Sequence, residues 1–167
     1  MNLSLRATFY LLFSLFVITS CSKSDDTAAD YPVIGNRIMQ EQDSAIRKYM
    51  ADNNLELIQD FSGIYYKIEK PGDPGAFMTL NSIPTITYTR RNLKDSILDA
   101  SFGSTDFDGR PLKDHIMGWQ VGLRKIGKGG KIFLIIPSPL GFGNVAVGNI
   151  IPANSVLVCD MELVDFK

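Results

Sequence analysis

The chain places one short helical segment among several strand-like segments, and this order limits the folds open to it. Within residues 116–125, the side chains of Ile116, Trp119 and Leu123 are spaced to share one face of a helix. Most strand-like segments precede or follow that helix, and few strands alternate with helices, as they would in a mainly parallel sheet. The order therefore predicts an α+β domain in which an antiparallel β-sheet packs over the short α-helix.

Alternation of apolar and polar residues with a period of two, or a short apolar run, marks the expected strands. They are predicted at residues 64–68, 85–89, 97–98, 131–136 and 156–166. Glycine, proline and polar residues dominate the intervening stretches. We therefore expect turns at residues 70–75 and 127–130, and loops at residues 101–113 and 140–152.

The N-terminus has the features of an exported protein. Arg6 precedes an apolar run at residues 7–19, which as a helix would cover roughly 20 Å of the ~30 Å hydrocarbon core of a bilayer. The run is therefore typical of a signal peptide rather than of a membrane-spanning helix. It ends in Ile18-Thr19-Ser20-Cys21, which resembles the bacterial lipobox and predicts lipidation of Cys21. An ordinary secretory signal followed by a chance cysteine is the alternative.

Four parts of the chain follow from these patterns. They are a lipoprotein signal peptide at residues 1–20, a flexible tether at 21–30, a helical extension at 31–61 and the main domain at 62–167. In the extension, Ile46, Tyr49 and Met50 gather on one side of a helix predicted over residues 36–54. The lipid anchor predicts a location in the cell envelope. Ser22 after the lipidated cysteine favours the outer membrane of a Gram-negative bacterium, periplasmic or surface-exposed.

Charge and residue supply argue against several classes of function. The 17 Lys and Arg residues are balanced by 18 Asp and Glu residues, so no electrostatic signature of nucleic-acid binding is present. A zinc site needs about four Cys or His ligands, whereas the chain has one histidine, His115, and two cysteines. We therefore expect no nucleic-acid partner, no metal and no cofactor. Cys159 shares a strand face with Leu157 and Met161, which favours a buried small side chain over a reactive thiol.

Three apparent chemical motifs have simpler explanations. The glycines and lysines of 127–131 suggest a phosphate loop, but a helix precedes them and a strand follows, so a tight turn is favoured. Asp106 and Asp108 lie in a polar loop, whereas a glycosidase pair needs apolar burial to separate its two pKa values. His115 has no nucleophile evident in the sequence, which argues against a catalytic triad.

Aromatic and apolar residues gather around the predicted short helix, and a plain hydrophobic core would explain any one of them. Their flanking segments, in order, are Ile86-Thr87-Tyr88-Thr89, Leu98-Asp99-Ala100-Ser101, Ile116-Met117-Gly118-Trp119-Gln120, Gly129-Gly130-Lys131, Ile136-Pro137, Gly141-Phe142-Gly143, Ile150-Ile151-Pro152 and Leu157-Val158-Cys159-Asp160-Met161-Glu162-Leu163. Together these segments resemble the FKBP-type peptidyl-prolyl cis/trans isomerase family over residues 62–167, in its exported lipoprotein form.

The resemblance implies both a fold and an activity. The fold is an antiparallel sheet half-wrapped around a short helix, here with the N-terminal helical extension. The activity is rotation of Xaa-Pro peptide bonds, which assists the folding of exported proteins and needs no cofactor. The implied partners are proline-containing peptides or unfolded exported proteins, together with the membrane that holds the lipid anchor. A dry aromatic pocket would favour the twisted amide over the more polar planar one.

The resemblance also implies a role for each matching residue. The implied catalytic residues are Tyr88 as a wall, Asp99 at the rim, Ile116 as a backbone N–H donor and Trp119 as the floor. The implied substrate-binding residues are Leu98, Phe107, His115, Phe142, Ile150, Ile151 and Cys159, with Ile150 as a second wall.

Three positions depart from the family pattern. Leu98 stands where a phenylalanine is usual, Phe142 where a tyrosine donates its hydroxyl, and Cys159 where an aromatic closes the pocket. These changes predict a larger pocket with weaker activity, unless Phe107 or Phe102 refills it. They also support an alternative, in which the chain is a non-catalytic, peptide- or protein-binding lipoprotein of the cell envelope.

Overall fold

A computed structural model of the protein describes residues 30–167, with side chains from residue 37 onward. The predicted signal peptide, the lipidation site Cys21 and the tether up to residue 29 lie outside the described residues. Among residues 30–167, no helix combines the length and the apolar character needed to cross a membrane.

Two α-helices and six strands make up the described part of the chain. The helices are α1 at Asp30–Asp52 and α2 at Met117–Gly122, the second continued by a 3-10 turn at Leu123–Lys125. The strands are β1 (Ile58–Gln59), β2 (Tyr65–Lys70), β3 (Pro84–Arg91), β4 (Ile97–Ala100), β5 (Lys131–Ile136) and β6 (Leu157–Phe166). Two further 3-10 turns lie at Leu112–Asp114 and Ser138–Leu140.

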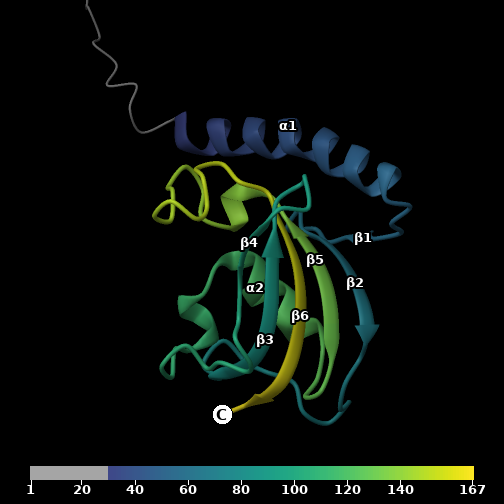
Figure 1. The fold of residues 1–167 in the computed structure, drawn as a ribbon, viewed down its shortest axis with the longest axis vertical. Coiled ribbons are helices and arrows are strands. Elements are labelled where there is room, and N and C mark those ends of the chain that lie inside the picture. The colour runs from purple at the N-terminus through teal and green to yellow at the C-terminus, as the bar shows by residue number, and fades with distance from the viewer. Residues whose placement is uncertain (1–29) are drawn as a thin grey trace, which may run out of the picture.

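All six strands form one antiparallel sheet in the order β1-β2-β5-β6-β3-β4. The helix α2 lies against one face of this sheet, and α1 crosses its upper end (Figure 1). The predicted α+β class and the antiparallel sheet around a short helix are therefore confirmed, as is the presence of the N-terminal helix.

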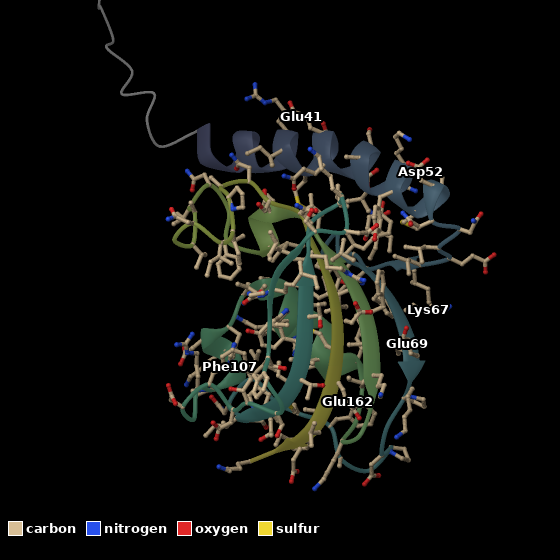
Figure 2. The ribbon with its side chains drawn as sticks, in the orientation of Figure 1. Glu41, Asp52, Lys67, Glu69, Phe107 and Glu162 are labelled. Atoms are coloured by element: carbon tan, nitrogen blue, oxygen red, sulfur yellow. The ribbon has the colours of Figure 1, made fainter. Side chains whose placement is uncertain are left out.

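The sheet is covered on both faces near α1, and the sequence of β5 reflects this. Ile132, Leu134 and Ile136 belong to the core beneath α2, whereas the alternate residues Phe133 and Ile135 belong to a second cluster with α1. A strand that is buried on both faces reads as a continuous apolar run instead of an alternating one. The helix α1 contributes its own apolar side chains to the second cluster, while Glu41 and Asp52 project into solvent (Figure 2).

Two glycines set how closely α2 approaches the sheet. A methyl group added at Gly118 would lie 2.5 Å from Cγ2 of Ile136, and one added at Gly122 would lie 2.5 Å from Cδ1 of Leu134. The two glycines are four residues apart and so lie on the same face of the helix. Their missing side chains let the backbone of α2 rest directly on β5.

The observed elements differ from the predicted ones mainly at their ends. The helix α1 begins at Asp30 instead of residue 36, and α2 begins at Met117 because Ile116 has the extended backbone of a cap residue. Strand β1 was not predicted, since its two residues are both exposed and carry no periodic pattern.

Candidate active site

A cavity of about 230 Å³ opens between the start of α2, strand β3 and the two long loops that follow β4 and β5. Its lining residues are Arg90, Phe107, Arg110, Asp114, His115, Ile116, Trp119, Phe142 and Val147. Pockets for drug-sized ligands typically hold roughly 300–1,000 Å³. This cavity is smaller, and its size suits a single side chain of a longer ligand.

Trp119 forms the floor of the cavity. Its side chain is 2% exposed, and aromatic rings surround it. The ring of Tyr88 meets it edge-on with centroids 5.0 Å apart, and the rings of Phe107 and His115 lie 5.7 Å away. The buried indole N–H has no hydrogen-bond partner among the described residues. The floor is therefore a buried indole surrounded by aromatic side chains.

Ile116 is the residue before the first turn of α2. Its carbonyl accepts hydrogen bonds from the backbone N–H groups of Trp119 and Gln120, at 3.0 and 3.1 Å. The first N–H groups of a helix have no partner within the helix itself. Among the described residues, the N–H of Ile116 makes no hydrogen bond, and the residue lines the cavity. The geometry therefore leaves a backbone donor at the cavity.

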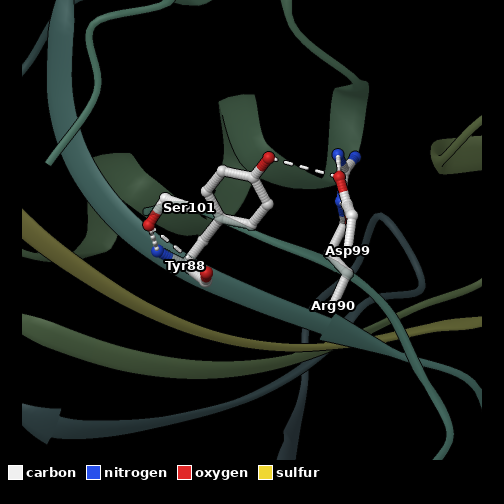
Figure 3. Close-up of polar contacts among 4 residues, drawn as sticks. All are labelled: Tyr88, Arg90, Asp99 and Ser101. Atoms are coloured by element: carbon white, nitrogen blue, oxygen red, sulfur yellow. Dashed lines mark hydrogen bonds and ion pairs between the residues drawn. The ribbon is translucent and has the colours of Figure 1, made fainter. Parts of the chain in front are cut away.

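Residues of β3, of β4 and just after β4 form a polar cluster (Figure 3). Two members of this cluster, Tyr88 and Arg90, contact the Trp119 ring. The Tyr88 hydroxyl donates to Oδ2 of Asp99 over 3.2 Å, and Arg90 donates to both carboxylate oxygens, with Nε 2.6 Å from Oδ1. Ser101 holds the other end of Tyr88, because its Oγ accepts the Tyr88 backbone N–H at 3.0 Å. The carboxylate of Asp99 thus fixes two side chains of β3 at once.

Arg90 is a buried cation inside this site. Its side chain is 10% exposed, and its guanidinium carbon lies 5.0–5.2 Å from the ring centroids of Tyr88, Trp119 and Phe142. Burial alone would lower the pKa of Arg90, but its hydrogen bonds to Asp99 outweigh this effect and raise the pKa. The side chain therefore stays charged, held by one carboxylate and three aromatic faces.

His115 closes the cavity beside the floor. Its ring meets Phe107 edge-on with centroids 4.9 Å apart and stacks on Trp119. Burial lowers the pKa of His115 and outweighs its hydrogen bond to the Arg110 carbonyl, which acts in the opposite direction. The imidazole is therefore neutral near pH 7 and adds to the aromatic wall.

The helix α1 supports the loop that carries Phe142. The side-chain amide of Gln42 donates to Oγ of Ser138 at 2.9 Å, and the backbone N–H of Ser138 donates back to the Gln42 side chain at 2.8 Å. The same amide also donates to the carbonyl of Asn154 at 3.0 Å. These contacts hold both ends of the loop that forms one side of the cavity.

The structure brings some of the sequence-predicted site residues to the cavity and places others elsewhere. Those that line the cavity are Phe107, His115, Ile116, Trp119 and Phe142. Tyr88 packs against its floor, and Asp99 holds Tyr88 and Arg90. Leu98 packs against the core under α2, and Ile151 and Cys159 are buried within that core. Ile150 is 54% exposed and is absent from the lining, so the structure gives it no wall position.

Cys159 is fully buried, and burial raises the pKa of its thiol to about 12. The thiol is therefore protonated at neutral pH and has the low reactivity expected of a buried cysteine. Phe102 is fully exposed, whereas Phe107 stacks on Tyr88 with centroids 5.7 Å apart. Arg90 stands opposite Cys159 in the register of β3 and β6, and Phe107 lies beside the floor, with its ring centroid 5.7 Å from that of Trp119.

Sequence reasoning missed four lining residues: Arg90, Arg110, Asp114 and Val147. A usable signal existed for Arg90, because side chains two residues apart on a strand point to the same face. Tyr88 was expected at the site, so Arg90 should face the same side of β3. Among the described residues, no group of three His, Cys, Asp or Glu side chains is placed to hold a metal ion.

Comparison with known proteins finds relatives of one family in both sequence and fold. Residues 85–164 match the family model described as FKBP-type peptidyl-prolyl cis-trans isomerase. The chain is 44% identical over 110 residues to the FKBP-type peptidyl-prolyl cis-trans isomerase FkpA of Buchnera aphidicola, a match that covers 64% of this chain and 42% of the relative. It is 43% identical over 81 residues to FkpA of Escherichia coli, covering 46% of this chain and 30% of the relative.

Solved structures show the same architecture. The crystal structure of FkpA from Escherichia coli matches with a TM-score of 0.66 and 27% identity, covering 81% of this chain and 64% of that one. A peptidyl-prolyl cis-trans isomerase from Pseudomonas syringae shares the fold with a TM-score of 0.63, covering 77% of this chain and 96% of that one. Residues 85–164 are thus similar to the FKBP-type peptidyl-prolyl cis-trans isomerase family. The chain spans about half the length of the curated relatives that it matches first.

Proposed function

We propose that the protein is a peptidyl-prolyl cis-trans isomerase whose substrates are proline-containing segments of exported proteins. The observation that carries the proposal is the cavity itself, in which an aromatic floor at Trp119 lies beside the unpaired backbone N–H of Ile116. One proline ring would rest on the indole, and the N–H would bind a carbonyl of the same peptide and fix its orientation.

No covalent step is needed for this reaction. Rotation about a peptide bond faces a barrier of ~18–20 kcal/mol because the planar amide is stabilised by resonance. The planar form is more polar and better solvated than the twisted form. A largely apolar cavity therefore favours the twisted form relative to the planar form, which is preferential binding of the transition state. The rings of Tyr88 and Phe107 would exclude water from the rotating bond.

Lipid anchoring at Cys21 and a location at the outer membrane complete the proposal. Their support is the apolar run and the lipobox-like Ile18-Thr19-Ser20-Cys21, which the sequence places before the described residues. Wild-type protein should then incorporate radiolabelled palmitate, and a Cys21→Ser variant should not. Incorporation by this variant would contradict lipidation at that position.

A non-catalytic binding lipoprotein is the second candidate, and the missing hydroxyl at Phe142 favours it. One lost hydrogen bond removes about 0.5–1.5 kcal/mol of net interaction, which slows catalysis but does not abolish peptide binding. The deciding experiment compares an Ala-Leu-Pro-Phe peptide with Ala-Leu-Ala-Phe. The isomerase proposal predicts that the full-length protein binds the proline peptide and accelerates its cis-trans exchange. Binding without acceleration would support the second candidate.

A further inference from the structure

Burying the charge of Arg90 costs desolvation free energy, and filling space does not by itself explain why a charged side chain is kept there. Its guanidinium is buried and pairs with Asp99. The rings of Tyr88, Trp119 and Phe142 surround it. Burying an ion pair carries a desolvation penalty, and apolar residues of similar volume are often as stable or more stable in its place. A charge kept at such a position is consistent with a role in the site's chemistry.

The hydrogen bonds of Arg90 leave one of its nitrogens without a partner. Nε and Nη2 both donate to the carboxylate of Asp99, in a two-point contact that fixes the plane of the guanidinium. Among the described residues, Nη1 makes no hydrogen bond, and Arg90 lines the cavity. The group is therefore held rigidly by one edge, with donor capacity left on the other.

The rotating amide offers an acceptor that matches this donor. In the planar amide, the nitrogen lone pair is delocalised into the carbonyl group and accepts hydrogen bonds poorly. As the bond twists, resonance is lost and the lone pair becomes localised on the nitrogen. A donor aimed at that nitrogen binds the twisted amide more strongly than the planar one, which lowers the barrier.

We propose that Arg90 is a catalytic residue of this protein, donating a hydrogen bond from Nη1 to the prolyl nitrogen as the peptide bond rotates. The proton stays on the arginine throughout, and no covalent bond forms or breaks. The inference rests on the proposed isomerase function of the same cavity. In this mechanism, Arg90 supplies a donor in a site where Phe142 has no hydroxyl group.

The test separates the rate on the enzyme from the affinity for the peptide. Full-length wild-type protein and an Arg90→Met variant are saturated with an Ala-Leu-Pro-Phe peptide. Exchange NMR gives the rotation rate in the complex, and a titration gives the dissociation constant. Hydrogen bonds to charged groups are worth about 1.5–3 kcal/mol, so Arg90→Met should slow rotation about 10–100-fold. The dissociation constant should change less than about threefold, because the planar peptide is not the partner.

Arg91→Met is the matched control, because it removes the same group from the next residue of β3. Arg91 pairs with Asp160 and is not part of the cavity lining. Its replacement should leave the rate and the affinity within twofold of wild type. An Arg90→Lys variant keeps the charge with fewer donors and should give an intermediate rate. If Arg90→Met fails to fold, the rotation rate of Arg90→Lys is compared with that of wild type instead.

Three results would overturn the inference. An unchanged rotation rate in Arg90→Met would show that Arg90 only fills space beside Cys159. If Arg90→Met binds the peptide more weakly but rotates it at an unchanged rate in the complex, then Arg90 donates its hydrogen bond to the planar peptide. A wild-type protein that binds the peptide without accelerating its rotation would remove the isomerase function itself, a failure distinct from the first two.

Discussion

Arg90 and Cys159 stand directly opposite each other in the register of β3 and β6, and both are buried on the side of the sheet that faces α2. Opposed residues on neighbouring strands have Cβ atoms about 4.5–5.5 Å apart and share the available volume. The small cysteine and the long arginine therefore form one packing unit. Arg90, which the family resemblance did not identify, therefore fills volume left by the cysteine that stands at position 159 in place of an aromatic.

This packing unit predicts that restoring an aromatic side chain at position 159 lowers the stability of the protein. A Cys159→Phe substitution restores the usual aromatic, but it forces a ring into space that Arg90 already occupies. Overpacking a buried site costs about 1–3 kcal/mol, so the variant should be less stable than wild type in chemical denaturation. An additional Arg90→Gly change should recover part of that loss. A Cys159→Phe protein as stable as wild type would show that the two side chains do not compete.

The close approach of α2 to β5 predicts the effect of adding a single methyl group. Gly118→Ala gains about 0.8–1 kcal/mol in helix propensity, but its methyl would lie 2.5 Å from a buried atom of Ile136. Overpacking of about 1–3 kcal/mol outweighs that gain. The variant should therefore lose stability in urea denaturation. Because α2 carries Trp119, the affinity of the Gly118→Ala protein for a proline peptide should also fall. Equal or higher stability would mean that the helix moves away from the sheet without cost.

The buried ion pair between Asp60 and Lys125 predicts a large loss of stability when one of its two charges is removed. The Asp60 side chain is 7% exposed, and its Oδ2 accepts a hydrogen bond from Lys125 Nζ at 2.6 Å. Removing one partner of a buried pair typically costs about 3–5 kcal/mol. Because the Ser62 N–H also donates to Asp60, we expect Lys125→Met to lose about 3 kcal/mol, at the low end of that range. Lys48→Met, which breaks an exposed pair on α1, should lose less than about 1 kcal/mol.

Acid should weaken the fold through the same carboxylate. Burial alone would raise the pKa of Asp60, but hydrogen bonds from Lys125 and Ser62 outweigh it and lower the pKa from 3.8 to about 2. The stability that this group contributes is therefore complete above pH 4 and is lost as the pH falls toward 2. Denaturation midpoints measured between pH 7 and pH 2 should show this loss, and Asp60→Asn should flatten it. A pH profile unchanged in Asp60→Asn would assign the acid sensitivity to other groups.

His115 adds a second pH dependence at higher pH. Its pKa is lowered by burial, so the neutral ring is favoured in the folded protein. The associated stability is present above about pH 6.5, the ordinary pKa of histidine, and is lost as the pH falls through the lower folded value. His115→Phe keeps an aromatic wall and should remove this dependence between pH 7 and pH 5. If the variant keeps the same slope as wild type, the imidazole does not titrate in that range.

The sequence predicted the elements whose burial is periodic. Strand β5 was predicted with its observed bounds, because a continuous apolar run, buried in two clusters over Ile132–Ile136, lies between flanking glycine and proline. Trp119 was placed on the short helix by spacing alone. The family resemblance supplied roles for matching positions, but it could not identify residues that are particular to this chain. Arg90 was missed for that reason, although its strand face followed from Tyr88.

Tertiary contacts determine the features that the sequence could not predict. Nothing local indicates that Gln42 on α1 reaches Ser138, since the two are 96 residues apart in the chain. Likewise, Ile150 and Ile151 are adjacent and identical, yet one is 54% exposed and the other 2% exposed. The fold of the loop decides which of the two side chains points inward. Spacing and residue type carry no information about that choice.

If the cavity above Trp119 rotates Xaa-Pro bonds, truncating an aromatic side chain inside the cavity should slow the rotation, and truncating one outside it should not. The rate of cis-trans exchange in an Ala-Leu-Pro-Phe peptide is measured with full-length wild type, Trp119→Ala and Phe61→Ala. Phe61 is fully exposed and is not one of the cavity's lining residues, so its loss controls for removal of an aromatic ring. Wild type and Phe61→Ala should accelerate the exchange, and a folded Trp119→Ala protein should lose at least tenfold in rate, equivalent to about 1.4 kcal/mol. Equal acceleration by folded Trp119→Ala and wild type would contradict this role of the cavity.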